Sequence, residues 1–214
     1  MPTTKHIIWD WNGTILDDVE ACVASINRML AVRQLQTISI DQYRDIFDFP
    51  VKNYYRNLGF DLQTEDWDAM ANEFHRHYAE LSPDASLRNG IHRTLASFAE
   101  LDIPMSILSA CEINILERML REHNIRNFFQ FVFGLDNLYA ESKLDRGIKL
   151  MQKLNIPPQE ILMIGDTNHD YEVAQELGIR CILLSGGHQS AQRLNATQLI
   201  TSTQELIAII QSET

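Results

Sequence analysis

The sequence is poor in basic residues, in cysteine and in long apolar runs. Lysine and arginine together number 18 against 29 aspartate and glutamate residues, which gives a formal net charge of -11 and an isoelectric point near 5.0. Because binding a phosphate backbone requires a basic face, this balance argues against a nucleic-acid partner. No stretch reaches the roughly 18 consecutive apolar residues of a transmembrane helix, so we expect no membrane span.

The cysteines also exclude some classes of protein. Cys22, Cys111 and Cys181 are odd in number, widely spaced and without a CxxC pair. This pattern predicts buried free thiols in a reducing compartment and argues against a disulfide framework. The N-terminal segment meets Asp10 before it can form the long apolar stretch of a signal peptide. We therefore expect a cytoplasmic protein.

The chain does contain a regular alternation of strand-like and helical patterns. Its 214 residues, 45% of them hydrophobic, can form one large domain or a core with a modest insertion. Repeated strand–helix units predict an α/β fold with a doubly wound, Rossmann-like parallel sheet that helices cover on both faces. The expected strands are His6–Trp9, Ile103–Leu108, Phe129–Phe133, Ile161–Ile164 and Cys181–Leu184.

Polar residues directly follow three of these expected strands. Asp10 comes after the first strand, Ser109 after the second and Asp166 after the fourth. In an open parallel sheet the ligand crevice lies beyond the carboxyl ends of the strands. We therefore expect these three side chains to converge.

One segment near the N-terminus breaks the alternation of strand and helix. It holds helical patterns at Val19–Val32 and Asp66–Leu81 without a convincing strand, and Ser82–Asp84 resembles a return hinge. We expect this segment to be an all-helical cap inserted after the first strand. The predicted division is a core of residues 1–16 and 85–214 with a cap of residues 17–84.

Two acidic motifs indicate phosphoryl chemistry. Residues 7–14, Ile-Ile-Trp-Asp-Trp-Asn-Gly-Thr, place Asp10 between a strand and a tight turn. A carboxylate that attacks phosphorus needs a cation beside it, because both reactants are anionic. Residues 165–170, Gly-Asp-Thr-Asn-His-Asp, supply Asp166 and, one helical turn later, Asp170. Ligation by oxygen alone suits Mg²⁺.

The first motif resembles the DxDGT signature of the haloacid dehalogenase superfamily, whose members mostly transfer phosphoryl groups through an aspartyl intermediate. Ser109 resembles the second motif of that superfamily, and Lys143 resembles the third, a lysine that neutralises the nucleophile and the phosphate. The resemblance covers essentially the whole chain, and the core with its helical cap looks most like the phosphoglycolate phosphatase branch.

The resemblance implies roles for particular residues. The catalytic positions would be Asp10, Asn12 and Lys143. The substrate would be a small phosphorylated metabolite, and the cofactor would be Mg²⁺ bound by Asp10, Asn12 through its backbone carbonyl, Asp166 and Asp170. The phosphoryl group would be held by Gly13, Thr14, Ser109, Ala110 and Lys143.

One residue departs from the signature. The second Asp, which acts as general acid and base in the phosphatases, is Asn12 here. Losing a general acid/base typically costs roughly 10²–10⁴-fold in rate, which still leaves turnover. A slow phosphatase is therefore the leading interpretation. The alternatives are a phosphonatase-like enzyme that cleaves a C–P bond and a catalytically silent protein that binds a phosphorylated ligand.

The alternatives depend on a few other residues. Dehalogenases dispense with the metal, so an intact pair of Asp10 and Asp166 counts against that reaction. A phosphonatase would form a Schiff base on a cap lysine, and Lys52 is the only lysine in the expected cap, although an exposed lysine at a helix start is the simpler interpretation. Asp17 and Asp18 are expected to cap the first cap helix, with a proton relay in place of Asn12 as their alternative role.

The remaining expectations concern specificity and assembly. A cap over the crevice excludes water and macromolecules, so specificity should reside in the Phe47–Tyr55 loop and neighbouring cap residues. His188 follows a strand in a Gly-Gly loop and could line the crevice, although a loop histidine without a role is the simpler interpretation. We expect a monomer or a weak homodimer.

Overall fold

A six-stranded parallel sheet forms the centre of the computed structural model, which describes residues 3–140 and 142–213. The strand order is β5-β4-β1-β6-β7-β8, with β1 in the interior of the sheet. This topology confirms the predicted α/β fold. The strands are β1 (His6–Trp9), β4 (Met105–Glu112), β5 (Phe129–Leu135), β6 (Ile161–Gly165), β7 (Arg180–Leu184) and β8 (Leu199–Ile200).

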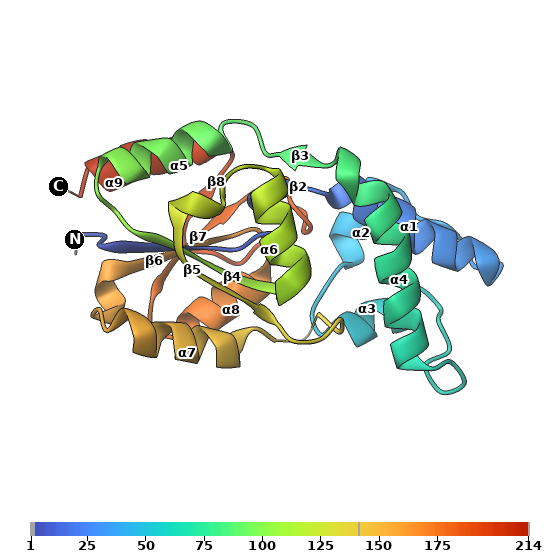
Figure 1. Ribbon diagram of the computed structural model, residues 1–214. Coiled ribbons are helices and arrows are strands. Elements are labelled where there is room, and N and C mark those ends of the chain that lie inside the picture. Colours follow the sequence, from blue (N-terminus) through green and yellow to red (C-terminus); the bar gives the residue numbers. More distant parts are fainter. Residues whose placement is uncertain (1–2, 141, 214) are drawn as a thin grey trace.

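Helices cover both faces of this sheet because its strands are apolar on both sides. In β1, Ile7 and Trp9 join one buried cluster and Ile8 joins another. The first cluster includes side chains of α5, α6 and α9, and the second includes side chains of α7 and α8 (Figure 1). These helices are α5 (Ile91–Glu100), α6 (Ile113–Glu122), α7 (Leu144–Leu154), α8 (Asn168–Glu176) and α9 (Thr203–Gln211).

The helical insertion lies beyond the carboxyl ends of the sheet strands, on the side opposite to the chain termini (Figure 1). It contains α1 (Val19–Val32), α2 (Ile40–Ile46), α3 (Val51–Asn57) and α4 (Trp67–Leu81). Two short antiparallel strands, β2 (Leu16–Asp17) and β3 (Ser86–Leu87), join the outgoing and returning segments. The boundaries at residues 16/17 and 84/85 stay a prediction.

Several elements differ from the sequence-based expectation. Strand β4 continues to Glu112, past the expected end at Leu108, with a register shift in its last part. The expected Phe47–Tyr55 loop follows α2 directly and is shorter than expected, because α3 already begins at Val51. Strand β8 and helix α9 lie outside the elements that the sequence predicts. Strand β8 has only two residues, which is too few to show a period.

A core loop holds the cap through backbone carbonyls. The loop after β7 lies against α2, where the Arg44 guanidinium donates to the carbonyl oxygens of Gly186 at 2.9 Å and Gly187 at 3.0 Å. In the opposite direction, the Arg193 guanidinium donates to the carbonyl oxygen of Phe47 at 2.6 Å. We refer to these contacts of Arg44 and Arg193 as the cap latch.

Two expectations about composition can be compared with the fold. No helix in the described ranges is long and apolar enough to cross a membrane. The three cysteines are free thiols; Cys22 and Cys181 are buried, whereas Cys111 is only half-buried.

A buried histidine makes the stability of the core depend on pH. His6 Nε2 lies 2.9 Å from Ser106 Oγ, and burial lowers the pKa of His6 to about 4. In the unfolded chain the pKa of histidine is near 6.5, so the unfolded state binds the proton first. The stability that neutral His6 contributes is complete above pH 6.5 and is lost as the pH falls toward 4.

We therefore expect His6→Gln to flatten the pH dependence of the unfolding free energy between pH 6.5 and 4, by up to about 3 kcal/mol. Urea denaturation across this range measures the effect. His92→Gln, at an exposed position, is the matched control and should retain the wild-type profile. An unchanged profile in His6→Gln would contradict the assignment.

Candidate active site

Three buried carboxylates gather at the carboxyl edge of the sheet. Asp10 follows β1 and is held there by a hydrogen bond from its backbone N–H to the Ile164 carbonyl at 2.8 Å. Asp166 follows β6, and Asp170 lies in the first turn of α8. Oxygen atoms of the three carboxylates lie within 4.8 Å of one another. The expected convergence of Asp10 and Asp166 is therefore present.

Local hydrogen bonds shape the loop that carries Asp166. Thr167 caps α8, and Asp170 Oδ2 accepts hydrogen bonds from the backbone N–H groups of Asp166 at 3.1 Å and Thr167 at 2.9 Å. The Thr14 hydroxyl donates to Asp166 Oδ1 at 2.8 Å. A Cβ added at Gly13, where φ is +72°, would lie 2.3 Å from Asp166 Oδ2, so this position requires glycine.

Lys143 connects the carboxylates of Asp10 and Asp170. Its side chain is only 2% exposed, and its ammonium contacts Asp10, lies 2.5 Å from Asp170 Oδ1 and donates to the Leu108 carbonyl at 3.0 Å. Burial alone would lower the pKa of this ammonium, but the two carboxylates outweigh burial and hold the pKa above its usual value. The lysine therefore remains charged beside the nucleophile position.

The site carries more negative than positive charge. Burial raises the pKa of the Asp10 carboxyl to about 8 despite the Lys143 ammonium, and the charges of Asp170 and Asp166 add to the rise. A divalent cation bound among the three carboxyl groups would offset this repulsion and keep Asp10 ionised at neutral pH. Because the available donors are oxygens, the residues fit Mg²⁺.

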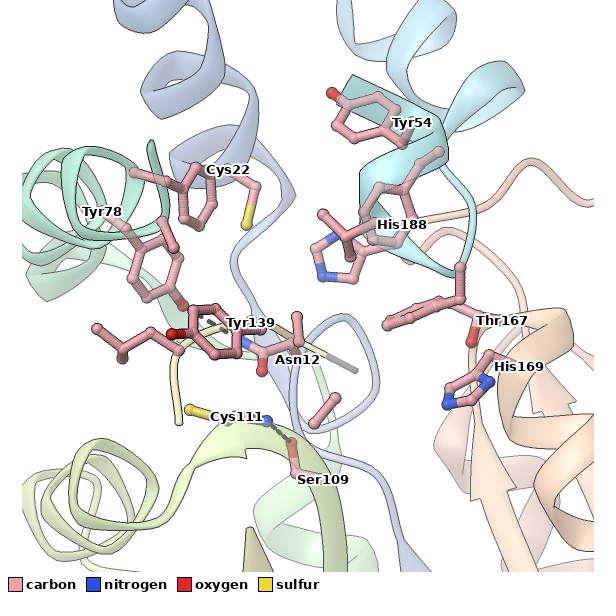
Figure 2. A pocket seen from close by; sticks show the side chains of 18 of the residues that line it. Asn12, Cys22, Tyr54, Tyr78, Ser109, Cys111, Tyr139, Thr167, His169 and His188 are labelled. Carbon is pink, nitrogen blue, oxygen red and sulfur yellow. Dashed lines mark hydrogen bonds between the residues drawn. The ribbon is translucent and has the colours of Figure 1, made fainter. Parts of the chain in front are cut away.

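Ser109 and Ala110, at the position of the second motif, line a cavity beside the three carboxylates. Ser109 is buried near the end of β4, and its Oγ accepts a hydrogen bond from the Cys111 N–H at 3.0 Å (Figure 2). Ser109 and Ala110 line the cavity together with Asp10 and Lys143. Neither Gly13 nor Thr14 is among its lining residues. Their role in binding the phosphoryl group stays a prediction.

Asn12 is fixed by a second carboxylate that the motif analysis did not assign to the site. Its Nδ2 donates to Asp18 Oδ2 at 2.7 Å and to the Tyr78 hydroxyl at 3.2 Å. The Tyr78 hydroxyl donates to the same Asp18 oxygen at 2.7 Å. The amide group of Asn12 thus points its donor at Asp18.

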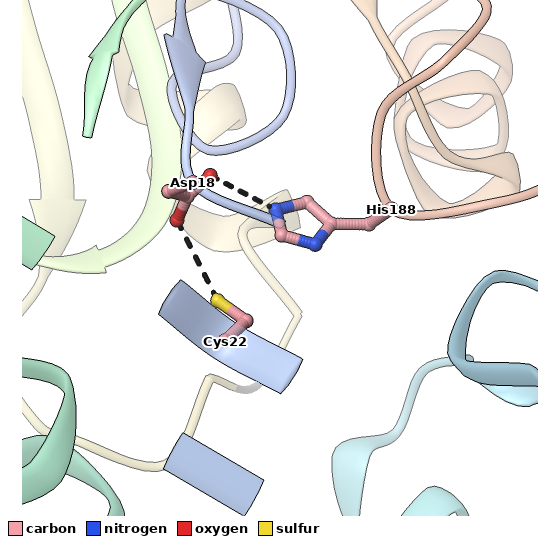
Figure 3. A group of neighbouring side chains, drawn as sticks. All are labelled: Asp18, Cys22 and His188. Atoms are coloured by element: carbon pink, nitrogen blue, oxygen red, sulfur yellow. Dashed lines mark hydrogen bonds and ion pairs between the residues drawn. The ribbon is translucent and has the colours of Figure 1, made fainter. Parts of the chain in front are cut away.

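Asp18 does not cap α1 with its side chain, so that prediction is wrong. Its carboxylate instead accepts a hydrogen bond from the Gly13 N–H at 3.0 Å. The same carboxylate lies 3.2 Å from His188 Nε2 and accepts a hydrogen bond from the Cys22 thiol at 3.6 Å (Figure 3). Together with the donors of Asn12 and Tyr78, these contacts saturate the carboxylate. Hydrogen bonding therefore accounts for the Asp18–Cys22–His188 cluster.

His188 contacts both the cap and the core. Its Nδ1 lies 2.8 Å from the Tyr43 hydroxyl, and its backbone N–H donates to Asp166 Oδ2 at 2.7 Å. Burial alone would lower the pKa of the imidazole, but Asp18 outweighs burial and raises the pKa to about 9. At neutral pH the two residues form an ion pair. His188 is therefore not the unengaged loop histidine that the sequence indicated.

Comparison with known proteins identifies the family. The model of the haloacid dehalogenase-like hydrolase family matches residues 7–184. The chain belongs to this family. A curated phosphoglycolate phosphatase from Pseudomonas putida is 25% identical over 201 residues, which cover 90% of this chain and 73% of that protein. These matches confirm the predicted enzyme class and the likeness to the phosphoglycolate phosphatase branch.

Solved structures share this fold over nearly the whole chain, including the helical insertion. A haloacid dehalogenase-like hydrolase from Streptococcus pneumoniae aligns with a TM-score of 0.85 at 18% identity, covering 97% of this chain and 99% of that one. The protein tyrosine kinase A of Mycobacterium tuberculosis aligns with a TM-score of 0.82 at 20% identity, covering 97% and 98%. Because differently named proteins share the fold, the reaction must be argued from the site.

The sequence could not show the contacts around Asn12 in this haloacid dehalogenase-like hydrolase. Asp18 and His188 are 170 residues apart, and Tyr78 comes from α4. The only local signal is the acidic pair Asp17-Asp18 at the exit from the first strand, which a helix start explains equally well.

The Asn12–Asp18 hydrogen bond predicts strong coupling between these positions. In Asn12→Asp a second carboxylate would replace a donor 2.7 Å from Asp18 Oδ2. We expect this variant to lose about 1–3 kcal/mol of unfolding free energy. Adding Asp18→Asn should recover part of the loss, because donor and acceptor then exchange places.

Urea denaturation of the wild type, both single variants and the double variant measures the coupling as a double-mutant cycle. Asp17→Asn, at the neighbouring exposed carboxylate, is the control and should show no coupling to position 12. A coupling energy below about 0.5 kcal/mol between positions 12 and 18 would be at odds with the hydrogen bond.

Proposed function

We propose that this protein is a Mg²⁺-dependent phosphatase of small phosphorylated metabolites that forms an aspartyl phosphate on Asp10. The observation that carries the proposal is the buried Asp10 carboxylate, held against Lys143 and beside Asp166 at the floor of a cavity under the cap. The curated relatives named phosphoglycolate phosphatase support the same reaction type.

The proposed reaction has two steps. A carboxylate oxygen of Asp10 attacks phosphorus, and the bond to the leaving oxygen breaks as the new P–O bond forms. Water then attacks the aspartyl phosphate, which releases inorganic phosphate and restores Asp10. Lys143 offsets the negative charge on Asp10 and the transferring group, while Ser109 and the backbone of Ala110 are placed to hold phosphoryl oxygens.

The three carboxylates have different roles in this proposal. Mg²⁺ would be held by Asp10, Asp166 and the backbone carbonyl of Asn12, and it would supply charge neutralisation at the phosphoryl oxygens. Asp170 faces Lys143 with Oδ1 and the Thr167 backbone with Oδ2. We assign Asp170 to positioning Lys143 and the Asp166 loop, and its direct contact with the cation stays a prediction.

Asn12 should make turnover depend on the leaving group. Its amide donates a hydrogen bond but does not give up a proton at neutral pH. Asp18, the alternative relay, does not supply the proton either. Burial alone would raise its pKa, but His188 foremost, together with Tyr78 and Asn12, holds the pKa below its usual value. An alkoxide would therefore leave almost unassisted.

The structure offers no support for the phosphonatase alternative. Lys52 is exposed, its ammonium lies 5.1 Å from the centroid of the Trp67 ring, and it does not line the cavity. A Schiff-base lysine would have to face the substrate. The silent binder remains the outcome if no phosphate ester is hydrolysed.

The expected partner remains a small molecule. A cavity of about 150 Å³ under the cap has no room for a macromolecular chain. We retain a monomer or weak homodimer in the cytoplasm as the expectation from the sequence.

Hydrolysis should require Mg²⁺ and stop when EDTA is added. Asp10→Asn and Asp166→Ala should each lower kcat by roughly 10³-fold or more, because the nucleophile or a cation ligand is lost. Phosphate release from acetyl phosphate measures the effect. Asp145→Ala, an exposed carboxylate in the first turn of α7, is the control and should retain activity. Activity that survives EDTA would instead favour metal-free chemistry.

Rates should rise steeply as the leaving group becomes more acidic, with acyl and aryl phosphates far ahead of alkyl phosphates. The combined variant Asn12→Asp/Asp18→Asn should raise turnover of alkyl phosphates by roughly 10²–10⁴-fold, the usual gain from a positioned acid/base. It should gain little on acetyl phosphate. Unchanged alkyl turnover would mean that another group already supplies the proton.

A further inference from the structure

Aromatic side chains of the cap form one wall of the cavity above the carboxylates. The cavity occupies about 150 Å³, and apolar cavities of roughly this size in other proteins admit a benzene ring. Figure 2 shows Tyr54 at the far end of the pocket from Ser109. The cap contributes Tyr43, Phe47, Phe49, Tyr54, Trp67 and Phe74 to the lining.

These rings are already packed as aromatic groups prefer. Phe47 stacks on Tyr43 with ring centroids 5.0 Å apart and meets Tyr54 edge to face at 5.3 Å. On the core side, Phe49 stacks on His169 at 4.4 Å. Such a wall offers both faces and edges to a further ring.

The same cavity has no free cation for an anionic substrate group. Among the described lining residues the only lysine or arginine is Lys143, which is engaged by Asp10 and Asp170. The imidazoles of His75 and His169 are already engaged, since His75 Nε2 lies 3.2 Å from the Leu138 carbonyl oxygen and the His169 ring stacks on Phe49. His188 is paired with Asp18. A carboxylate in this space would lose its hydration without gaining a partner.

Two polar atoms in the aromatic wall lack a hydrogen-bond partner within the described part of the chain, and Trp67 Nε1 is one of them. The Tyr54 hydroxyl is buried and has no hydrogen-bond partner within the described ranges. A buried hydroxyl is ordinarily satisfied by protein, water or ligand. An uncharged polar substituent on a bound ring would satisfy it.

We propose that the organic part of the substrate is a single aromatic ring without charge, so that the protein hydrolyses the phosphate monoester of a phenol. This inference rests on the phosphatase activity proposed above. Asp10 forms a bond to phosphorus as the P–O bond to the ring oxygen breaks, and the electron pair leaves on the phenolate, which takes its proton from solvent. Water then releases inorganic phosphate from Asp10.

Asn12 supports the inference from a separate direction. The phenolate needs no proton from the protein to depart, whereas glycolate leaving from phosphoglycolate is an alkoxide that does. The aromatic cavity and the missing acid therefore favour the same class of substrate.

The test compares 4-carbamoylphenyl phosphate with 4-carboxyphenyl phosphate, which match in shape and differ in charge. With Mg²⁺ present, kcat/KM should be higher for the carbamoyl ester by about 100-fold or more, and phosphoglycolate should be a poor substrate. Benzyl phosphate, which carries the ring on a poor leaving group, should react slowly yet compete with phenyl phosphate. Equal or reversed preference between the two isosteres, or a preference for phosphoglycolate, would overturn the inference.

Variants locate the effect in the cavity. The ratio of kcat/KM for phenyl phosphate to that for acetyl phosphate should fall about tenfold in Phe47→Leu. Phe60→Leu, in a buried cap ring that does not line the cavity, is the matched control and should keep this ratio within about twofold of the wild type. Equal falls in both variants would overturn the assignment.

Acetyl phosphate separates the two proposals. If it is not hydrolysed, the phosphatase proposal fails, and calorimetric binding of the two isosteric esters to the same protein still tests the cavity. If acetyl phosphate is hydrolysed but the charged isostere is accepted equally, only the aromatic substrate is wrong.

Discussion

The site depends on the neutralisation of buried negative charge at the carboxyl end of β1. Asp10 is buried where a carboxylate alone would be unstable, and Lys143 offsets part of its charge while also contacting Asp170. Asp170 in turn orders the loop that carries Asp166. The parallel order β4-β1-β6 makes this arrangement possible, because it sets the ends of three strands side by side. Removing the Lys143 ammonium would leave the Asp10 and Asp170 carboxylates without their shared countercharge.

A second charged pair joins the cap to this centre. Asp18 stands at the start of α1 and is held by Tyr78 of α4 and by His188 of the core. Asn12 departs from the phosphatase signature, and its amide donates a hydrogen bond to the same Asp18 carboxylate. The Asn12 amide therefore helps to hold the cap on the core, although it cannot act as the general acid.

Much of this arrangement could be predicted from sequence because each part has a local signal. The strands β1 and β6 are short apolar runs that end in Asp10 and Asp166, and the helices α1 and α4 show clear periodicity. Strand β8 has only two residues and thus no period. The contacts of Asp18 and His188 depend on how the cap folds back over the core, which no local pattern encodes.

The cap latch has a consequence for how the family can diverge. Arg44 and Arg193 bind backbone carbonyls, so these accepting partners exist whatever residue stands at that position, and Arg193 additionally pairs with the Asp48 carboxylate at 3.1 Å. The side chain of Phe47 can therefore change while its carbonyl still holds Arg193. The aromatic rings that face the cavity can therefore change during evolution while the cap latch still holds the cap on the core.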